Sequence, residues 1–193
     1  MIHNNIINLT ETKQASVQLL KAVKLNLGFL PNLFSVIAES SASLQAFIEM
    51  NEQFAKSTFS ATEKEVIQTA ASVENQCNYC VAGHTKFAEV QGVSSTVIQA
   101  IRDNREIIDS KLEALNQFTR NLVRHKGFLA TQEITPFIDA GYKAEQVIEV
   151  ILGICVKTFS NLTNNLMSIE LDDVFLQYQW QSEEQAENQL ARI

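Results

Sequence analysis

Two cysteines and a histidine stand close together near the middle of the chain, in the order Cys77, Cys80 and His84. Spacings of three and four residues place all three side chains on one face if the segment is helical. A thiol reacts as its thiolate, and a histidine one turn away is a candidate for the base that produces it. Cys77 is close enough to Cys80 to form a disulfide with it if the local backbone permits. The pattern predicts a nucleophilic thiol, a base and a resolving thiol within eight residues.

The segment before the cysteines carries the signal for the start of a helix. Ser60 and Glu63 match a capping box, and the apolar residues that follow recur at helical spacing. We expect this helix to end near residues 75–76 and a second helix to begin at the cysteine pair. The two helices would then form an antiparallel hairpin.

Such a hairpin would bring a carboxylate to the histidine. Residues about ten before the turn would lie near residues about eight after it, so Glu65 could face His84. Along one unbroken helix, Glu65 and Cys77 would be roughly 18 Å apart, so the turn is required for this role. Glu63 is explained by the capping box and Glu74 is expected to be a solvated residue of the hairpin, but either would replace Glu65 in another register.

The remaining sequence also predicts helices. Only 6 Gly and 2 Pro interrupt the 193 residues, and no segment alternates between apolar and polar residues with the period of a strand. The Ser-rich segment 40–43 is expected to be a turn. Further helices are predicted over residues 10–24, 32–39, 44–54, 95–102, 112–126, 131–140 and 144–167. The expected fold is all-α, in a single domain over residues 1–193.

A weak internal similarity appears when the chain is aligned with itself at a shift of 81 residues. This shift aligns Cys80 with Asn161 and His84 with Asn165, although identities are few. A real repeat would mean two similar helical halves in one domain. The second half would keep the packing and lack the redox centre.

Composition and charge exclude several classes of function. The formal charge is −7, and no cluster of Lys or Arg marks a surface for nucleic acid. Three cysteines are too few for a secreted disulfide framework, and the N-terminus lacks the pattern of a signal peptide. The longest apolar stretch, residues 147–156, is interrupted by Glu149 and is too short to span a bilayer. We therefore expect a cytoplasmic protein with neither nucleic acid nor membrane as a partner.

The combined pattern resembles the carboxymuconolactone decarboxylase superfamily, and most closely its AhpD-like, peroxidase-related branch. The signature of that branch is a glutamate twelve residues before a Cys-x-x-Cys pair and a histidine four residues after it. Glu65, Cys77, Cys80 and His84 match it in this chain. Residues 28–32, and the pattern of Phe159, Asn161 and Asn165, also resemble segments of that branch. The resemblance covers nearly the whole chain.

The resemblance implies an AhpD-like helical bundle with thiol peroxidase or disulfide reductase activity. By position, Cys80 matches the thiol that attacks peroxide, Cys77 the resolving thiol, and His84 with Glu65 the proton relay. A lipoyl-bearing or thioredoxin-like protein would restore the thiols. Trimers or hexamers would be the assembled form, and no metal, flavin or haem cofactor is implied.

The chain departs from the best-studied AhpD proteins at Tyr79, where they carry a second histidine. Tyr79 would either donate a hydrogen bond near the thiolate or serve as a buried aromatic residue. Asn161 and Asn165 would either line the site or simply stabilise the turn of the copied second half. Cys155 lies in an apolar helix and is predicted to be an inert part of the core.

Other interpretations remain, and the simplest is that Cys77 and Cys80 are two small residues packed in the core without a reaction. Cys77, Cys80 and His84 would supply three zinc ligands, but a structural zinc site usually has four. A non-enzymatic thiol switch would form the same disulfide and use it to change assembly or a partner interface. The lactone decarboxylases that name the superfamily do not depend on a Cys-x-x-Cys pair, so the cysteines weigh against that activity.

Overall fold

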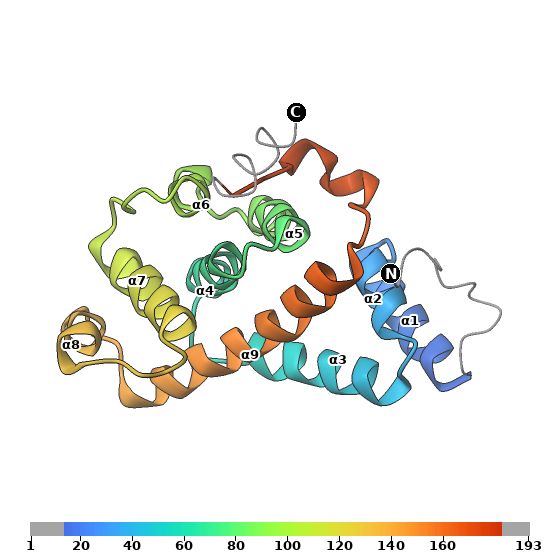
Figure 1. Ribbon diagram of the computed structural model, residues 1–193, viewed down its shortest axis with the longest axis horizontal. Helices are drawn as coiled ribbons and strands as arrows, with labels where there is room; N and C mark the ends of the chain where they lie inside the picture. The colour runs from blue at the N-terminus through green and yellow to red at the C-terminus, as the bar shows by residue number, and fades with distance from the viewer. Residues whose placement is uncertain (1–13, 183–193) are drawn as a thin grey trace.

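Two antiparallel helices lie at the centre of the protein, and the others surround them (Figure 1). The computed structural model describes residues 14–182. The central pair, α4 and α5, contacts α6 and α9, and α4 also packs against α7. The bounds of these helices are α4 Ala61–Glu74, α5 Asn78–Val90, α6 Ser95–Arg102, α7 Ser110–Arg124 and α9 Ala144–Met167.

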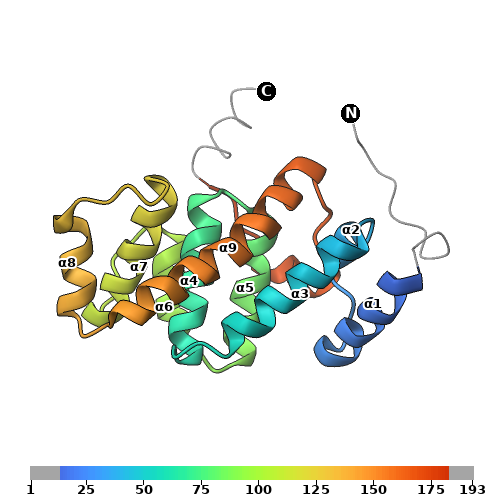
Figure 2. The ribbon, with the colours of Figure 1, turned by 90° about the horizontal axis from the view of Figure 1, so that it is seen from below.

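The remaining elements extend this core at both ends. Helix α3 runs beside the long helix α9, as Figure 2 shows, and α8 packs on α7. A short 3-10 helix, η1, lies against α5. The bounds of these elements are α1 Gln14–Leu27, α2 Asn32–Ile37, α3 Ser41–Ala55, α8 Thr131–Asp139 and η1 Asp173–Tyr178.

The all-α prediction is confirmed, since no strand occurs within residues 14–182. The capping box at the start of α4 is present: the Ser60 backbone N–H donates to Glu63 Oε2 at 2.8 Å, and the Glu63 N–H donates to Ser60 Oγ at 3.3 Å. The structure also contains η1, which the sequence did not predict. Residues 10–13 of the first predicted helix lie outside the described part of the chain.

The prediction of a turn at residues 40–43 is wrong. Helix α3 begins at Ser41, and Ser40 is its N-cap, with its Oγ accepting the backbone N–H of Ser43. Serine is favoured both in turns and at N-caps because its hydroxyl bonds nearby backbone groups in either place. The serine-rich composition therefore did not distinguish a turn from a helix N-cap.

The weak internal similarity at a shift of 81 residues does not correspond to a repeat of the observed helices. A shift by 81 residues places the turn between α4 and α5 on residues 156–158. Helix α9 is continuous there, and Val156 and Lys157 are both buried in its middle. The described structure thus has no second hairpin at this register.

Glycine at position 153 lets three helices meet closely in the core. A Cβ atom there would lie 2.7 Å from a ring carbon of Phe54 and 2.8 Å from Cγ2 of Ile67. Both neighbours are fully buried, one on α3 and the other on α4. The missing side chain therefore sets how near α9 can approach the hairpin that carries the cysteines.

Helix α9 has the length and apolar composition of a membrane-spanning helix, and it is the one such helix within residues 14–182. The core helix of a soluble protein passes the same test, so this is weak evidence for a membrane span. In the structure α9 packs against α3, α4 and α5. The sequence predicted an apolar stretch too short to span a bilayer, but the helix is long enough, and only 33% of its apolar window is buried in the fold.

Candidate active site

The turn between α4 and α5 places the two cysteines. Gln76 adopts a left-handed conformation with φ of 53°, so the chain reverses after α4. The backbone N–H of Gln76 donates to the Val73 carbonyl, and that of Cys77 donates to the Ser72 carbonyl. This pair of bonds is the Schellman motif that ends many helices. It brings Cys77 directly to the start of the next helix.

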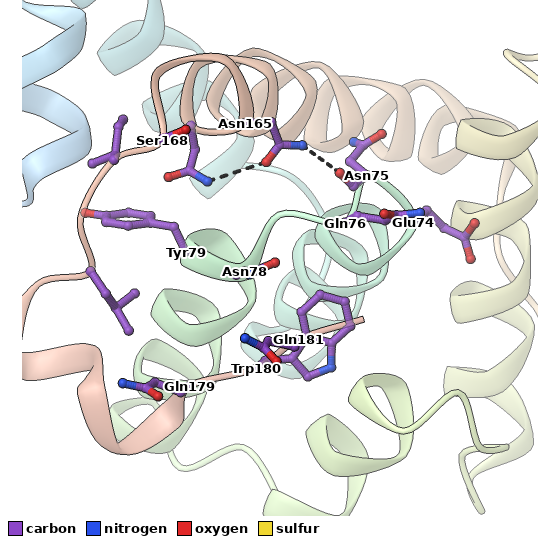
Figure 3. Close-up of a pocket in the computed structure, with 13 residues that line it drawn as sticks. Glu74, Asn75, Gln76, Asn78, Tyr79, Asn165, Ser168, Gln179, Trp180 and Gln181 are labelled. Atoms are coloured by element: carbon purple, nitrogen blue, oxygen red, sulfur yellow. Dashed lines mark hydrogen bonds between the residues drawn. The ribbon is translucent and has the colours of Figure 1, made fainter. Parts of the chain in front are cut away.

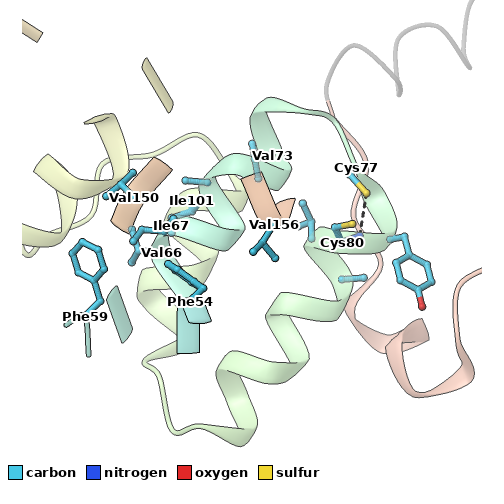
Figure 4. Close-up of a cluster of buried hydrophobic side chains, with 14 of the residues drawn as sticks. Phe54, Phe59, Val66, Ile67, Val73, Cys77, Cys80, Ile101, Val150 and Val156 are labelled. Atoms are coloured by element: carbon cyan, nitrogen blue, oxygen red, sulfur yellow. Dashed lines mark hydrogen bonds between the residues drawn. The ribbon is translucent and has the colours of Figure 1, made fainter. Parts of the chain in front are cut away.

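Cys77 is the N-cap of α5, and Cys80 lies in the first turn of that helix. The sulfur of Cys77 accepts the backbone N–H of Cys80 at 3.4 Å (Figure 4). Both thiols are reduced and buried. The prediction that a second helix begins at the cysteine pair is confirmed.

The hairpin brings Glu65 and His84 together as predicted. Oε2 of Glu65 lies 2.9 Å from Nδ1 of His84, and Oε1 of Glu65 accepts a bond from the side chain of Gln91. Glu65 and His84 are both buried, so this contact is shielded from water. Glu63 is occupied by its capping box, as expected.

Lys157 of α9 occupies the other side of the histidine ring. Its Nζ lies 2.7 Å from Nε2 of His84, and only 5% of the residue is exposed. An ammonium group can only donate, so Nε2 accepts from it and the ring proton stands on Nδ1, facing Glu65. The sequence analysis missed Lys157; a lysine in the middle of an apolar helix was the available signal.

This arrangement favours a neutral imidazole between two charged groups. Burial lowers the pKa of His84, and the Lys157 charge lowers it further, while Glu65 acts in the opposite direction. The result is a buried chain Glu65–His84–Lys157 that carries a carboxylate at one end and an ammonium at the other. Such a chain can pass a proton along its two hydrogen bonds.

The expected direct contact between His84 and Cys80 is not found. Within residues 14–182, both ring nitrogens of His84 are bonded to other side chains, and no hydrogen bond joins the ring to either thiol. The i, i+4 spacing put the two residues on one face, as predicted, but the ring turns toward α4 and α9. Lys157 is therefore the charged group that acts on the thiol.

The pKa of Cys80 is lowered to about 6, although its burial alone would raise it. A hydrogen bond from Cys77 and the positive charge of Lys157 outweigh the burial, with help from Asn161 and Ser160. Oγ of Ser160 lies 4.0 Å from the sulfur of Cys80. These groups make Cys80 the thiolate of the pair.

The pKa of Cys77 is raised well above its ordinary value. The main cause is burial, and the hydrogen bond that Cys77 makes with Cys80 adds to it. Cys77 therefore remains a protonated thiol. The expected order, with Cys80 as the attacking thiol, stays a prediction that now rests on these pKa directions and not on a contact with His84.

Asn161 and Asn165 both hold the turn before Cys77, and only Asn161 also acts on a thiol. The side chain of Asn75 donates to Oδ1 of Asn161 at 2.9 Å, and Nδ2 of Asn165 donates to the Asn75 carbonyl at 2.8 Å. The alternative role in a turn of the second half is wrong, because both residues lie in the continuous helix α9. Asn165 secures the turn before Cys77.

Tyr79 is a buried aromatic residue whose hydroxyl bonds groups away from the thiols. The hydroxyl donates to Asp172 and accepts the backbone N–H of Leu33. Its ring packs edge-on against Phe175 of η1, with 5.7 Å between ring centroids. Asp172, which the sequence analysis did not single out, thereby links the first turn of α5 to the segment before η1.

Two further predictions about single residues are wrong. Cys155 is exposed on α9 instead of lying in the core, because it falls on the outer side of a helix that is apolar on several faces. Glu74 is mostly shielded instead of solvated, since Arg120 and Arg124 bind its carboxylate at 2.9 and 2.8 Å. Neither arginine was placed near the turn from sequence alone.

A metal site built from these residues finds no support in the described geometry. Across residues 14–182, no group of three or more His, Cys, Asp or Glu side chains is gathered so that it could hold an ion. His84 is already bonded through both nitrogens. The chemistry that the described site can supply is that of a thiolate beside a buried ammonium.

Part of the chain matches a known protein family. Residues 42–119 match the model of the carboxymuconolactone decarboxylase family. That region contains α4, α5 and both cysteines. No curated protein sequence matches the chain.

Several solved structures share the fold. An AhpD-core, peroxidase-related protein from Ralstonia eutropha JMP134 has a TM-score of 0.79 and 20% identity, over 90% of this chain and 93% of the other. The debrominase Bmp8 has a TM-score of 0.76 and 17% identity, over 92% and 97%. A peroxidase-related protein from Silicibacter sp. TM1040 has a TM-score of 0.73 and 14% identity, over 91% of each chain. Over residues 42–119 the chain is thus similar to the carboxymuconolactone decarboxylase family, and it has an AhpD-like helical fold.

Proposed function

We propose that the protein is a thiol peroxidase of antioxidant defence in which Cys80 attacks the peroxide. The observation that carries this proposal is the buried chain Glu65–His84–Lys157, whose ammonium helps to lower the pKa of Cys80 to about 6. A thiol with that pKa is mostly thiolate at neutral pH. The peroxidase-related structures with the same fold support the reaction class.

In the first step the Cys80 thiolate attacks one peroxide oxygen, and the O–O bond breaks. The sulfur is oxidised to a sulfenic acid, and the second oxygen leaves as water or an alcohol once it has taken a proton. The Lys157 ammonium is a proton donor within the site. Lys157 then regains a proton from solvent, and the hydrogen bonds of His84 and Glu65 hold its amine in place.

In the second step Cys77 resolves the sulfenic acid. The Cys77 sulfur bonds to the Cys80 sulfur, the hydroxyl group leaves, and the thiol proton of Cys77 completes a water molecule. The hydrogen bond between the two cysteines supports this pairing. An external thiol then reduces the disulfide, for which a lipoyl-bearing or thioredoxin-like protein of a reducing cytoplasm is the expected donor.

The test is consumption of hydrogen peroxide and organic hydroperoxides in the presence of a thiol reductant. Turnover in large molar excess over protein supports the proposal, and consumption of one equivalent would indicate a thiol switch instead. The panel should include 2,3,4-tribromopyrrole, which is bound by the Bmp8 variant C82A in a structure with the same fold. If the protein released bromide from this compound and consumed no peroxide, debrominase activity would replace peroxidase activity as the proposed function.

Self-association is a further part of the proposal. Ile148, Ile151, Leu162 and Leu166 are exposed along α9, with the exposed Cys155 between them. Their spacings of three, four and seven residues form one apolar stripe on the outer face of the helix. Exposed apolar stripes of this kind mark interaction surfaces. We assign the stripe to contact with a second copy of the chain, in a trimer or hexamer.

A further inference from the structure

The apolar stripe on the outer face of α9 follows the heptad pattern of paired helices. Alternating steps of three and four residues connect Ile148, Ile151, Cys155, Thr158 and Leu162. The two isoleucines and the leucine are between 40% and 66% exposed, and Cys155 is exposed as well. Residues 14–182 leave these side chains largely uncovered, so the pattern favours contact with one further helix.

The stripe continues to Leu166 and leaves out Asn165, which occupies the next heptad position. Nδ2 of Asn165 donates to the Asn75 carbonyl, and Figure 3 shows this bond between α9 and the turn before the cysteines. Leu166 is 76% exposed and extends the stripe by one turn. At 1.5 Å per residue, the stripe from Ile148 to Leu166 is about 27 Å long. That length matches a second helix of similar size.

The charges of α9 bear on what covers the stripe. The stripe itself carries no charge. Lys157 is the one basic residue of α9, and it is buried on the inner side beside His84. A helix that lies on a membrane surface is typically rich in Lys and Arg along its polar side. Since α9 exposes neither, its composition favours a protein partner over a lipid surface.

A second copy of α9 fits the stripe in an antiparallel register. Helices with heptad spacing pack at about 20° to each other, with roughly 8–10 Å between their axes. If a two-fold axis passes between residues 156 and 157, Ile151 lies level with Leu162 of the second copy. Ile148 then falls within one residue of the level of Leu166. Each isoleucine of one copy thus meets a leucine of the other.

The ends of α9 favour the antiparallel direction over the parallel one. Parallel packing sets the positive ends of two helix dipoles side by side, and Glu145 beside its own copy. Antiparallel packing sets each positive end beside a negative one. It also brings the exposed Lys143 near the exposed Glu170 of the second copy, while Glu145 comes near Ser168, which carries no charge. Opposite charges therefore meet at both ends of an antiparallel pair.

We propose that two copies of the chain pair through this stripe, with their α9 helices antiparallel about a two-fold axis between Val156 and Lys157. The inference rests on the self-association in the proposed function and fixes its geometry. A two-fold contact uses the same face on both chains and closes on itself. A ring of three chains has no two-fold axis, so the assembly contains an even number of chains, as in a dimer or a hexamer.

Cross-linking of introduced cysteines tests the direction. Ile151→Cys, Leu162→Cys and the double variant are prepared in a Cys155→Ser background and treated with a short bis-maleimide at micromolar protein. The double variant should give cross-linked pairs and nothing larger, since each introduced thiol lies level with the other kind on the second copy. Each single variant should give less than a tenth of that yield, because its two copies of the thiol are about 16 Å apart along the paired helices. Val90→Cys, at an exposed residue of α5, measures chance collisions.

The unaltered thiol at Cys155 gives a second readout, because it lies within the stripe and is exposed in one chain. Pairing would cover it. At the same micromolar concentration, Cys155 should be alkylated at least five-fold faster in Leu162→Glu than in the wild type. Val90→Glu should leave the rate unchanged. Equal rates in all three proteins would overturn the pairing.

The remaining outcomes separate this inference from the proposed function. If Ile151→Cys alone cross-linked as well as the double variant, the helices would be parallel; the two-fold pairing would be overturned, and self-association would stand. Assembly without a cross-link in any variant would place the contact elsewhere and overturn the pairing too. A single chain that binds neutral phospholipid vesicles, and loses this binding in Leu162→Glu, would assign the stripe to lipid instead. None of these results depends on the consumption of peroxide.

Discussion

The Nζ atom of Lys157 lies 2.7 Å from Nε2 of His84, and both side chains are buried. This contact changes how the site is understood. The sequence pointed to His84 as the base next to Cys80. In the structure the Lys157 ammonium of α9 is bonded to the His84 ring, and its positive charge helps to lower the pKa of Cys80.

The pH dependence of Cys80 should follow from this charge. Alkylation of Cys80 should rise through a midpoint near pH 6 in the wild type, since the thiol is protonated below its pKa and ionised above it. Lys157→Met should move the midpoint upward, toward the ordinary value for cysteine, because the cation is lost while burial remains. Lys157→Arg keeps the charge and should restore part of the shift. Unchanged midpoints in both variants would show that Lys157 does not act on the thiol.

The order of the two thiols can be read from trapped intermediates. Cys80→Ser should abolish peroxide consumption, and Cys77→Ser should leave a sulfenic acid at Cys80 that a dimedone-type probe labels. The physical reason is that Cys80 is the ionised thiol and Cys77 the protonated one. Cys155→Ser, which changes an exposed thiol, is the control. Labelling of Cys77 as the first oxidised thiol in the wild type would reverse the assignment.

Glu65 and Lys157 should be coupled in stability through His84. Glu65→Ala removes the carboxylate and leaves the buried ammonium without compensation, which typically costs about 3 kcal/mol of unfolding free energy. Glu65→Ala combined with Lys157→Met removes both charges, so it should cost less than the sum of the single changes. Urea unfolding of the four proteins measures the coupling energy. Additive costs would mean that the two charges do not interact.

Two glycines on the helices of the site should respond in opposite ways to alanine. Gly153→Ala should lower the free energy of unfolding by about 1–3 kcal/mol, since its Cβ would lie 2.7 Å from Phe54 in a packed core. Gly83→Ala meets Phe175 only at 3.5 Å, an ordinary contact. It should be neutral or stabilising by up to about 1 kcal/mol, because alanine favours the helix. A harmless Gly153→Ala would show that α9 can shift outward at no cost.

The apolar stripe of α9 predicts the effect of a charge on assembly. Light scattering at micromolar protein should give a multiple of the 21.6 kDa chain for the wild type. Leu162→Glu should reduce that mass, since the residue is 63% exposed in one chain and would be buried against a second. Val90→Glu, at an exposed residue of α5, is the matched control. A wild-type mass of one chain in an active preparation would exclude the assembly.

The local elements of this protein were largely predictable from its sequence. The capping box at Ser60, the helix that starts at the cysteines and the limits of α9 each depend on neighbouring residues. Helical spacing also gave the pairing of Glu65 with His84, because a short turn between two helices restricts which residues can meet. These features are set within a few turns of chain, where sequence spacing translates directly into position.

The tertiary structure decided which groups complete the site. Lys157 lies 73 residues after His84, and Arg120 lies 46 residues after Glu74. The apolar surroundings of Lys157 mark it as unusual, but the local sequence does not indicate which residue either side chain contacts. Cys155 and Lys157 stand two residues apart on one apolar helix, yet one is exposed and the other buried. The side of α9 that faces the hairpin follows from how the helices pack, with Gly153 allowing the close approach. Periodicity identified the helix, and packing chose the face that reaches the thiols.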